Sequence, residues 1–294
     1  MLVLTRGEVE ELLDLEELVD AVAAALADVS AGRASMPPRV AAEGDAGGML
    51  LAMAAGVPSL GALTAKLVTL FPGNAGGPLA THQALIAAFD PATGEPVALL
   101  DGTAITALRT AAASALSARL LAPPGARVVA VVGTGVQGRA HARALGASFA
   151  EVVTVGRSAV EEAVRGADVV CCCTHADRPV LRRAWLKPGA HVTSVGFNPA
   201  GRELDEATVR DAVVVVESRE AALAPVPSGS NDLRGVAPED VVELGELVAG
   251  TRTADRERLT VYKSVGVAAE DAAATALVLA RARATGSGRV IELG

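Results

Sequence analysis

The chain has 294 residues, and 26 Lys and Arg against 34 Asp and Glu give it a net charge of −8. This acidic balance and an aromatic content of only 2% disfavour nucleic acid as a partner, because its recognition needs clustered cations and rings for base stacking. No run approaches the roughly 18 to 20 apolar residues that cross a membrane. The composition therefore favours a globular protein of about two domains that binds small molecules.

The first residues predict two helices. Thr5 with Glu8 and Asp14 with Glu17 have the spacing of capping boxes, and apolar residues then repeat at helical intervals up to Gly32. The N-terminal segment carries charges where a signal peptide needs an apolar core. We therefore expect a cytoplasmic chain from which nothing is cleaved or exported.

Residues 49–100 consist of short apolar runs separated by turn-forming segments, which predicts an antiparallel sheet. A helix is expected over about 103–121, and the Pro-Pro-Gly at 123–125 ends it. We place a domain boundary there. The first domain, 1–121, is expected to be an α+β substrate-binding and dimerisation domain, and the segment 264–294, with a final helix over about 269–284, returns to it.

Residues 122–263 alternate Val-rich runs with helical stretches. Continuous apolar strands of this kind are typical of a buried parallel sheet, so we predict a Rossmann-type, doubly wound α/β domain. Its three adjacent cysteines, Cys171 to Cys173, lack the spacing of a zinc site and cannot form a disulfide framework, and no metal cluster is expected. Inert packing in a strand, with thiols on both faces, is their expected role.

A glycine motif lies at one strand-to-helix junction of this domain. Gly133, Gly135 and Gly138 fit G-x-G-x-x-G, directly after ARVVAVV and before RAHARAL. In that context each glycine has a mechanical reason: a tight turn, a close approach to a pyrophosphate, and close packing of the helix on the strand. An ordinary glycine-rich turn is the alternative.

The residues after the next strand bear on the choice of dinucleotide. An Asp or Glu usually binds the ribose 2′-OH of NAD, but here Arg157 and Ser158 stand in that region, and they suit the 2′-phosphate of NADP. Alternatively, Arg157 lies over the adenine ring or in solvent. Only nine residues, AVEEAVRGA, precede the next apolar run, so one edge strand is expected to be missing and the sheet to be narrower than usual.

Three cations in the first domain predict an anion-binding pocket. Lys66 is the single charge in LGALTAKLVTLF, and Arg109 shares a helical face with apolar or small residues. Arg39 lies in an irregular, proline-fixed segment. A substrate carboxylate can supply the partner that these cations need, and the protein's own Asp and Glu are the alternative.

Two further polar residues carry open alternatives. His82 is either a core histidine or a polar contact near a nicotinamide. Asp271 begins the last helix, so it either stabilises the helix dipole or belongs to a site.

Several long motifs match one family. The chain resembles the ornithine cyclodeaminase/mu-crystallin family in KLVTLFPGN, GGPLATHQ, FDPATGEPVALLDGTAITALRTAAASALSARLLA, VVGTGVQGRAHARAL, VGFNPAGRELD and YKSVGVAAEDAA. The resemblance covers nearly the whole chain. It implies a homodimer in which the sheet of the first domain pairs with its mate, and an active site between that domain and a Rossmann domain.

The resemblance also implies roles for single residues. Arg39, Lys66 and Arg109 match the substrate-carboxylate residues, and Met53 is counted with the substrate site. The residues expected to contact the cofactor are Thr81, His82, Thr110, Gly133, Thr134, Gly135, Val136, Gln137, Gly138, Thr174 and Ser264, together with Arg157 and Ser158.

Two departures from the cyclodeaminases concern carboxylates. Those enzymes carry a Glu two residues before the Met that Met53 matches, where this chain has Leu51, and their catalytic Asp is matched by Asn198. An amide does not accept a proton from an amine at neutral pH. Lys66 and Asn198 are therefore the candidate catalytic residues of a different reaction.

We accordingly expect an NAD(P)H-dependent oxidoreductase acting on the C–N bond of a small imino or amino acid, with NADP preferred and NAD possible. A ketimine or cyclic imino acid reductase and an amino-acid dehydrogenase both fit. The alternatives are an NAD-dependent ornithine cyclodeaminase and a non-catalytic protein that binds NADPH and a small anion.

Overall fold

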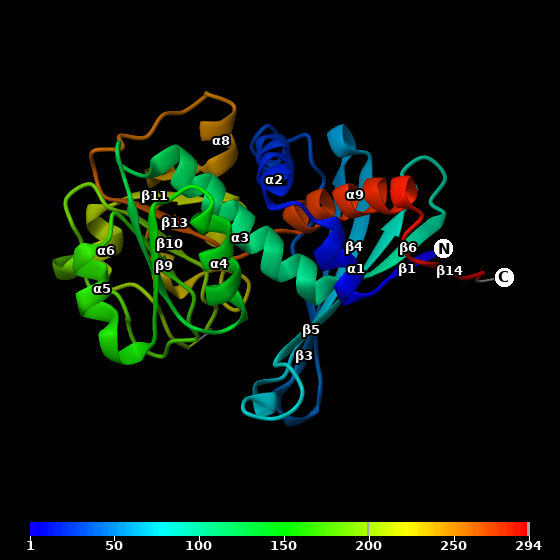
Figure 1. Ribbon diagram of the computed structural model, residues 1–294, viewed down its shortest axis with the longest axis horizontal. Coiled ribbons are helices and arrows are strands. Elements are labelled where there is room, and N and C mark those ends of the chain that lie inside the picture. The colour runs from blue at the N-terminus through cyan, green and yellow to red at the C-terminus, as the bar shows by residue number, and fades with distance from the viewer. Residues whose placement is uncertain (199, 293–294) are drawn as a thin grey trace. The chain divides into compact units, whose positions relative to one another are not determined.

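The computed structural model describes residues 1–198 and 200–292, and it forms two compact units (Figure 1). Unit 1 consists of Met1–Arg109 and Val267–Gly294, and unit 2 of Thr110–Gly266. The break lies within helix α3 (Gly102–Leu121), whereas we expected it after that helix. A helix is continuous in its own hydrogen bonds, so the sequence signals its end at Pro123 but not the residue at which its packing partners change. Residues 264–266, which we assigned to the first domain, belong to unit 2.

Unit 1 is built on a seven-stranded sheet, sheet A, with the order β14-β1-β6-β5-β4-β3-β2. Its strands are antiparallel to their neighbours except that β1 runs parallel to β6. The strands are β1 (Leu2–Leu4), β2 (Val40–Glu43), β3 (Met49–Val57), β4 (Ala62–Leu70), β5 (His82–Phe89), β6 (Pro96–Asp101) and β14 (Arg289–Val290). The antiparallel region expected over 49–100 is thus present, and β1, β2 and β14 extend it.

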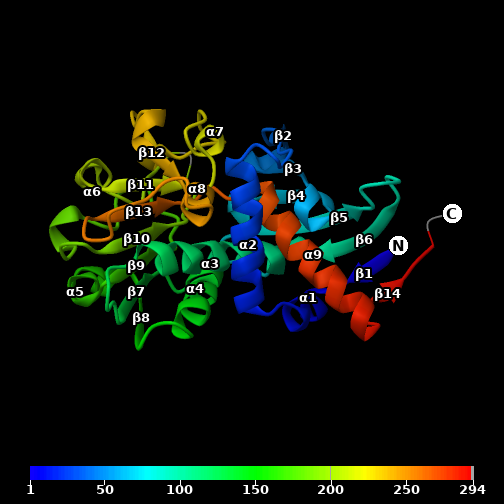
Figure 2. The ribbon, with the colours of Figure 1, turned by 90° about the horizontal axis from the view of Figure 1, so that it is seen from above.

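Helices cover one face of sheet A. Helix α9 (Ala268–Thr285) packs on β3 and β4, and α2 (Leu15–Ser30) packs beside α9 (Figure 2). Helix α1 (Arg6–Leu12) lies against β6. Helix α1 has the predicted capping box, in which the Glu8 carboxylate accepts from the Thr5 backbone N–H. At α2 the Asp14 carboxylate caps the helix by accepting from two of its N–H groups, as a simple N-cap and not as the predicted box. Alternate residues of β3 and β4 therefore point into a core under α9.

Unit 2 contains a parallel sheet, sheet B, with the order β12-β11-β13-β10-β9-β7-β8. Its strands are β7 (Val128–Val132), β8 (Glu151–Val155), β9 (Val169–Cys172), β10 (His191–Ser194), β11 (Val213–Val216), β12 (Val241–Glu243) and β13 (Thr260–Lys263). The helices are α4 (Val136–Gly146), α5 (Val160–Gly166), α6 (Glu206–Asp211), α7 (Arg219–Ala222) and α8 (Leu244–Val248). The Rossmann-type α/β fold is confirmed.

The two faces of sheet B bury separate apolar clusters. Cys172 belongs to the cluster with Val164 and Leu181, and Cys171 to the cluster with Ala118 and Leu145. Both thiols are buried, on opposite faces of β9, as the alternation along a strand predicts. Burial raises the pKa of Cys171 to about 12, which makes it an inert packing residue.

Beyond β7, sheet B has a single strand, as expected, but the sheet as a whole has seven strands and is not narrower than the six-stranded Rossmann order. Strand β8 is the last strand on that side, and the seven-residue helix α5 leads directly from β8 to β9 on the other side of β7. The direction of strand addition therefore reverses between β7 and β9. In open α/β sheets, ligands bind beyond the carboxyl ends of the strands at such a switch point.

Candidate active site

The glycine motif occupies the turn from β7 into α4. Gly133 has φ of +123°, and a Cβ there would lie 2.4 Å from the carbonyl oxygen of Cys173. A Cβ at Gly138 would lie 1.8 Å from the carbonyl oxygen of Gly133, so the helix can approach the loop only because residue 138 has no side chain. At Gly135 a Cβ would meet no atom within 4 Å. Two glycines thus allow close packing, and the third leaves open space above the turn.

This turn fits the pyrophosphate of a dinucleotide. Gly135 is the N-cap of α4 and brings no side chain to the first N–H groups of the helix, which are the groups that bind phosphate oxygens. Gln137 has a buried Oε1 that lacks a hydrogen-bond partner among the described residues, and Val136 is 58% exposed at the first helical position. These groups would be covered or satisfied by a ligand lying on Thr134 and the glycines.

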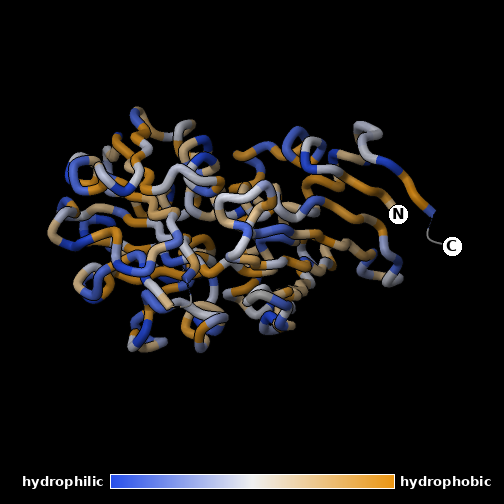
Figure 3. The backbone as a smooth tube through the Cα atoms, turned by 90° about the horizontal axis from the view of Figure 1, so that it is seen from below, coloured by the Kyte–Doolittle hydropathy of each residue, from blue (hydrophilic) through white to orange (hydrophobic). Residues whose placement is uncertain are grey.

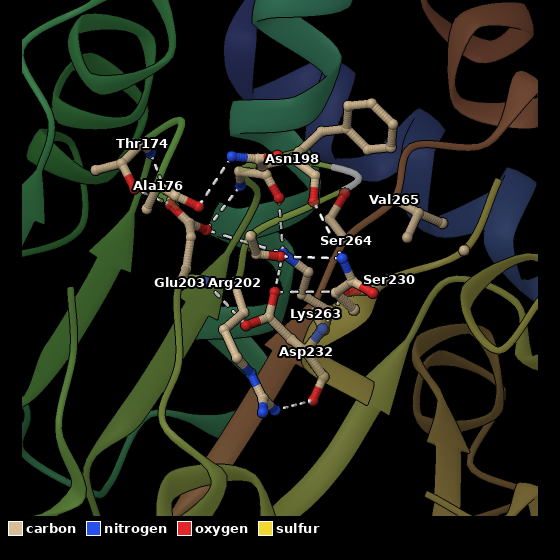
Figure 4. Close-up of a pocket in the computed structure, with 15 residues that line it drawn as sticks. Thr174, Ala176, Asn198, Arg202, Glu203, Ser230, Asp232, Lys263, Ser264 and Val265 are labelled. Carbon is tan, nitrogen blue, oxygen red and sulfur yellow. Dashed lines mark hydrogen bonds and ion pairs between the residues drawn. The ribbon is translucent and has the colours of Figure 1, made fainter. Parts of the chain in front are cut away.

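A small pocket lies beyond the carboxyl ends of the neighbouring strands (Figure 4). Thr174 follows β9, Asn198 follows β10, and Ser264 follows β13, and all three line it. Because the strands are parallel, their carboxyl ends meet at one edge of the sheet. The structure therefore brings together three predicted site residues that are far apart in sequence.

A buried ion cluster forms the floor of this pocket. The Lys263 Nζ donates to the carbonyl oxygen of Gly196 at 2.8 Å and to Ser194 Oγ at 3.0 Å, and lies 3.1 Å from Asp232 Oδ2 and 3.8 Å from Glu203 Oε2. Burial lowers the pKa of Lys263, but the two carboxylates outweigh it and hold that pKa above its ordinary value. The side chain is a structural cation.

The side-chain amide of Asn198 joins the loop after β10 to the loop after β9. The Nδ2 donates to the carbonyl oxygen of Ala176 at 3.2 Å and to Asp177 Oδ1 at 2.9 Å, and the Oδ1 accepts from the Ala200 N–H at 2.9 Å. These bonds hold the turn after β10 against the loop after β9. A catalytic role for Asn198 remains a prediction.

Unit 1 holds the predicted cations, and it pairs them internally. Lys66 Nζ lies 2.6 Å from Asp271 Oδ2, while Arg109 Nε lies 3.0 Å from Asp271 Oδ1 and Arg109 NH1 lies 2.7 Å from Glu270 Oε2. All four side chains are at most 5% exposed. The expectation that a substrate supplies their partner is therefore wrong, because the first turn of α9 already provides two carboxylates. Asp271 belongs to this cluster.

The environment of Lys66 changes its acidity. Burial lowers the pKa, Asp271 opposes the burial, the charge of Arg109 adds to it, and the result is a pKa of about 8. Among the other groups facing it, Thr106 Oγ1 lies 3.4 Å from the Nζ, and Met53 is its partner across β3 and β4. An ammonium with this pKa is mostly charged at neutral pH and can still release its proton.

Arg39 lies in the irregular segment before β2 and is half-buried. Val40, the next residue, is paired with Ala52 on β3, and the neighbouring Met53 is paired with Lys66 on β4. Met53 and Lys66 are thus direct partners on sheet A, Arg39 directly precedes the adjacent strand, and Arg109 joins Lys66 through Asp271.

The remaining predicted residues are spread over both units. His82 is exposed at the start of β5, where its Nδ1 lies 3.0 Å from Thr81 Oγ1, so the core-histidine alternative is wrong. Thr110 is buried within α3. Arg157 and Ser158 are exposed in the turn after β8, a position without a carboxylate at 156–158.

Sequence reasoning missed the buried carboxylates of unit 2. Glu203 accepts hydrogen bonds from Thr174 and Gly196, and Glu217 from Ser264 and Gly266. Glu217 directly follows the parallel strand β11, and this position was the available signal for it, whereas Glu203 lies in the loop that follows β10. Their partners lie up to 49 residues away, which local spacing does not reveal.

Several known proteins are similar to this chain in sequence and in fold. The model of the ornithine cyclodeaminase/mu-crystallin family matches residues 1–156 and 150–286. The ketimine reductase mu-crystallin of Mus musculus is 41% identical over 239 residues, which cover 74% of this chain and 75% of that protein.

Two solved structures extend the likeness to nearly the full length. The Thermococcus litoralis Δ(1)-pyrroline-2-carboxylate reductase, in complex with NADH and L-proline, is 30% identical, with a TM-score of 0.91 over 99% of this chain and 100% of that one. An archaeal alanine dehydrogenase dimer with bound NAD is also 30% identical, with a TM-score of 0.89 over 100% and 99%. This chain belongs to the ornithine cyclodeaminase/mu-crystallin family.

Proposed function

We propose that the protein is an NAD(P)H-dependent reductase of the C=N bond in a small ketimine or cyclic imino acid, or catalyses the reverse amino-acid dehydrogenation. The observation that carries the proposal is the glycine turn at the switch point of sheet B, in a chain 41% identical to a ketimine reductase. The cofactor supplies a hydride to the imine carbon. The nitrogen then needs a proton.

Lys66 is the proposed proton donor. At neutral pH its ammonium is mostly charged, and its pKa of about 8 makes the proton available to a substrate nitrogen. Reduction then balances as one hydride added to carbon and one proton added to nitrogen. The ion pair between Lys66 Nζ and Asp271 Oδ2, at 2.6 Å, fixes the position of the ammonium.

Charge balance explains the proposed role of Arg39. The charges of Lys66, Arg109, Glu270 and Asp271 already cancel, so a substrate carboxylate that joins them needs further positive charge. We propose Arg39, in the segment before the edge strand β2, for this role because a guanidinium can hold a carboxylate through two parallel hydrogen bonds. Met53, the partner of Lys66 across β3 and β4, provides an apolar contact for the carbon skeleton.

A panel of substrates tests the reaction. We expect oxidation of NADPH or NADH with cyclic imino acids, or with 2-keto acids plus ammonia or methylamine. Lys66→Met should lower this activity by several orders of magnitude while the affinity for the dinucleotide changes only a few fold, since Lys66 and the glycine turn belong to different units. Conversion of ornithine to proline without net turnover of the cofactor would instead support a cyclodeaminase.

Two observations disfavour that second function. Leu51 is a buried apolar residue on β3, where the cyclodeaminases have a carboxylate, and Asn198 is an amide whose groups bond to its own turn and to the loop after β9. A non-catalytic binder is the third candidate. Binding of NADPH with no turnover of any substrate in the panel would favour it.

We further propose that the protein prefers NADP(H) to NAD(H). Arg157 is exposed directly after β8, with Ser158 beside it, and a guanidinium and a hydroxyl suit a 2′-phosphate. Arg157→Ala should weaken NADPH binding by about 1.5 to 3 kcal/mol and leave NADH binding nearly unchanged. Calorimetric titration with both dinucleotides measures this difference, and equal effects on the two would refute the preference.

A further inference from the structure

Two buried carboxylates stand behind two hydroxyls of the pocket in unit 2. Glu203 is 2% exposed and Glu217 is fully buried. Glu217 follows β11, and Glu203 lies in the chain after β10 (Figure 4 shows Glu203 beneath Thr174). Thr174 and Ser264, which both line the pocket, are the hydroxyls that these carboxylates contact.

The contacts of Glu217 fix the direction of one hydrogen bond. Its Oε1 lies 2.9 Å from the Gly266 N–H, 3.1 Å from the Val265 N–H and 2.5 Å from Ser264 Oγ. A backbone N–H can only donate, so this oxygen is an acceptor. The Ser264 hydroxyl therefore gives its proton to Glu217.

Glu203 fixes a second hydroxyl in the same way. Its Oε1 accepts from the Thr174 N–H at 2.7 Å and from Thr174 Oγ1 at 2.6 Å. Its Oε2 accepts from the Gly196 N–H and from Ser194 Oγ, both at 2.7 Å. Each oxygen of Glu203 thus accepts from a backbone N–H, so both oxygens are acceptors. The Thr174 hydroxyl must therefore donate its proton to the hydrogen bond with Glu203.

A hydroxyl has one proton and two acceptor lone pairs. Because the protons of Thr174 and Ser264 are taken by Glu203 and Glu217, their oxygens meet any ligand in the pocket as acceptors. Ser194 differs, since it is fully buried and its oxygen already accepts from Lys263 Nζ at 3.0 Å. The pocket thus presents two oriented acceptors.

We propose that Glu203 and Glu217 are positioning residues that turn the hydroxyls of Thr174 and Ser264 into acceptors, so that the site selects a ligand with an N–H donor, the carboxamide NH₂ of the nicotinamide. The inference rests on the proposed function, which supplies the dinucleotide. The carboxylates act through the hydroxyls and touch no reacting atom.

Cofactor binding measured without turnover tests the proposal. In 3-acetylpyridine adenine dinucleotide phosphate, a methyl ketone replaces the carboxamide and the NH₂ donor is lost. Calorimetry should show that the wild-type chain binds this analogue about 5- to 30-fold more weakly than NADP, because one hydrogen bond is lost and one buried acceptor is left unsatisfied. Thr174→Val or Ser264→Ala should remove that difference.

Ser194→Ala is the matched control. It removes a buried hydroxyl from the same carboxylate, Glu203, but one that is already satisfied within the protein. It should lower the melting temperature and leave the preference for NADP over its analogue intact. A preference that is absent in the wild type, or that survives in both Thr174→Val and Ser264→Ala, overturns the proposal. Failure of the wild type to bind either dinucleotide would instead refute the proposed function.

Substitution of Glu217 separates positioning from folding. Gln can keep its oxygen at the Oε1 position, which accepts from Ser264 and Gly266. If Ser264→Ala shows that Ser264 is the hydroxyl that contacts the carboxamide, Glu217→Gln should therefore retain the preference for the carboxamide. Glu217→Ala frees the Ser264 proton and should lose it. Loss of the preference in both variants would show that the charge of Glu217, and not its acceptor oxygen, is what matters, which contradicts the proposal. If Glu217→Ala does not fold, the comparison of Ser264→Ala with Ser194→Ala decides.

Discussion

The two cations of the buried cluster in unit 1, Lys66 and Arg109, do not contribute equally to stability. Burial disfavours the Lys66 ammonium despite Asp271, and Asp271 keeps Arg109 as a partner when Lys66 is lost. We therefore expect Lys66→Met to leave the free energy of unfolding at neutral pH within about 1 kcal/mol of the wild type. Arg109→Met removes the ion pairs with both Glu270 and Asp271, whereas Lys66→Met removes one, so Arg109→Met should lower this free energy by about 3 to 5 kcal/mol.

Urea unfolding measures both changes. Arg165→Met is the control, because its partner Glu161 is 51% exposed and such a pair contributes at most about 1 kcal/mol. Equal losses in Lys66→Met and Arg109→Met would contradict the difference that the geometry implies. From the sequence alone the two cations look equivalent, and both variants are expected to keep their stability.

Lys66 also makes the stability of the protein depend on pH. Its pKa falls from 10.5 to about 8 on folding, so between these values the unfolded chain binds more protons, and stability rises with pH. At about 1.4 kcal/mol for each unit of pKa, the wild type should gain roughly 2 kcal/mol relative to Lys66→Met between about pH 7.5 and about pH 9.5. Unfolding titrations of the two proteins at both pH values check this, and a constant difference would show that Lys66 does not titrate there.

Single residues were predictable where their chemistry is local. The glycine turn lies within six residues, and each glycine has a role that its neighbours in sequence define. The partners of Lys66 and Arg109 were not predictable in this way, because Asp271 is 162 residues from Arg109. An acid in the first turn of a helix reads as a stabiliser of the dipole, and only the packing of α9 on β4 shows its second role.

At the scale of elements, the closeness of α4 to the glycine turn can be tested. Gly138→Ala places a Cβ 1.8 Å from the Gly133 carbonyl oxygen, whereas a Cβ at Gly146, at the end of the same helix, meets nothing within 4 Å. Gly138→Ala should lower the melting temperature and abolish dinucleotide binding, because the backbone must shift. Gly146→Ala should stabilise the protein by about 0.5 to 1 kcal/mol. Thermal unfolding of both variants, with dinucleotide titration, distinguishes close packing from a general intolerance of alanine in α4.

Long, patterned elements were predicted, and short ones were not. The Val-rich strands of unit 2 and the capped helices of unit 1 carry their own signals, and the nine-residue link predicted the direct passage from β8 to β9. Strands β1, β12 and β14 have only two or three residues each. So few residues show no period, and their pairing depends on strands elsewhere in the chain.

At the scale of the whole molecule, the face of sheet A opposite its helices exposes large apolar side chains. Figure 3 views the chain from this side. Large apolar residues point outward along the strands and are 37 to 65% exposed: Val40, Leu50, Leu63, Leu67 and Leu85. A contiguous patch of this kind marks an interface, and the archaeal alanine dehydrogenase of the same fold is a dimer.

No helix in the described part of the chain is long and apolar enough to span a membrane.

We expect a homodimer that buries this face. Leu67 and Leu85 are directly paired across β4 and β5, so Leu67→Lys and Leu85→Lys place charges at the centre of the patch. Sedimentation equilibrium at micromolar concentration should show a dimer for the wild type and a shift to monomer for each variant, with far-UV circular dichroism unchanged. A monomeric wild type would contradict the assignment of this face.

The position of the cysteines makes thiol labelling a measure of the opening of unit 2. The chain has three cysteines, all between residues 171 and 173, and hence all in unit 2. Thiol reagents attack the thiolate, which burial suppresses at Cys171 and Cys172. Their modification must therefore wait until sheet B opens, and no thiol in unit 1 adds to the signal. The rate of labelling at Cys171 and Cys172, measured separately from the half-buried Cys173, reports how often sheet B opens, and a dinucleotide bound at the glycine turn should slow it.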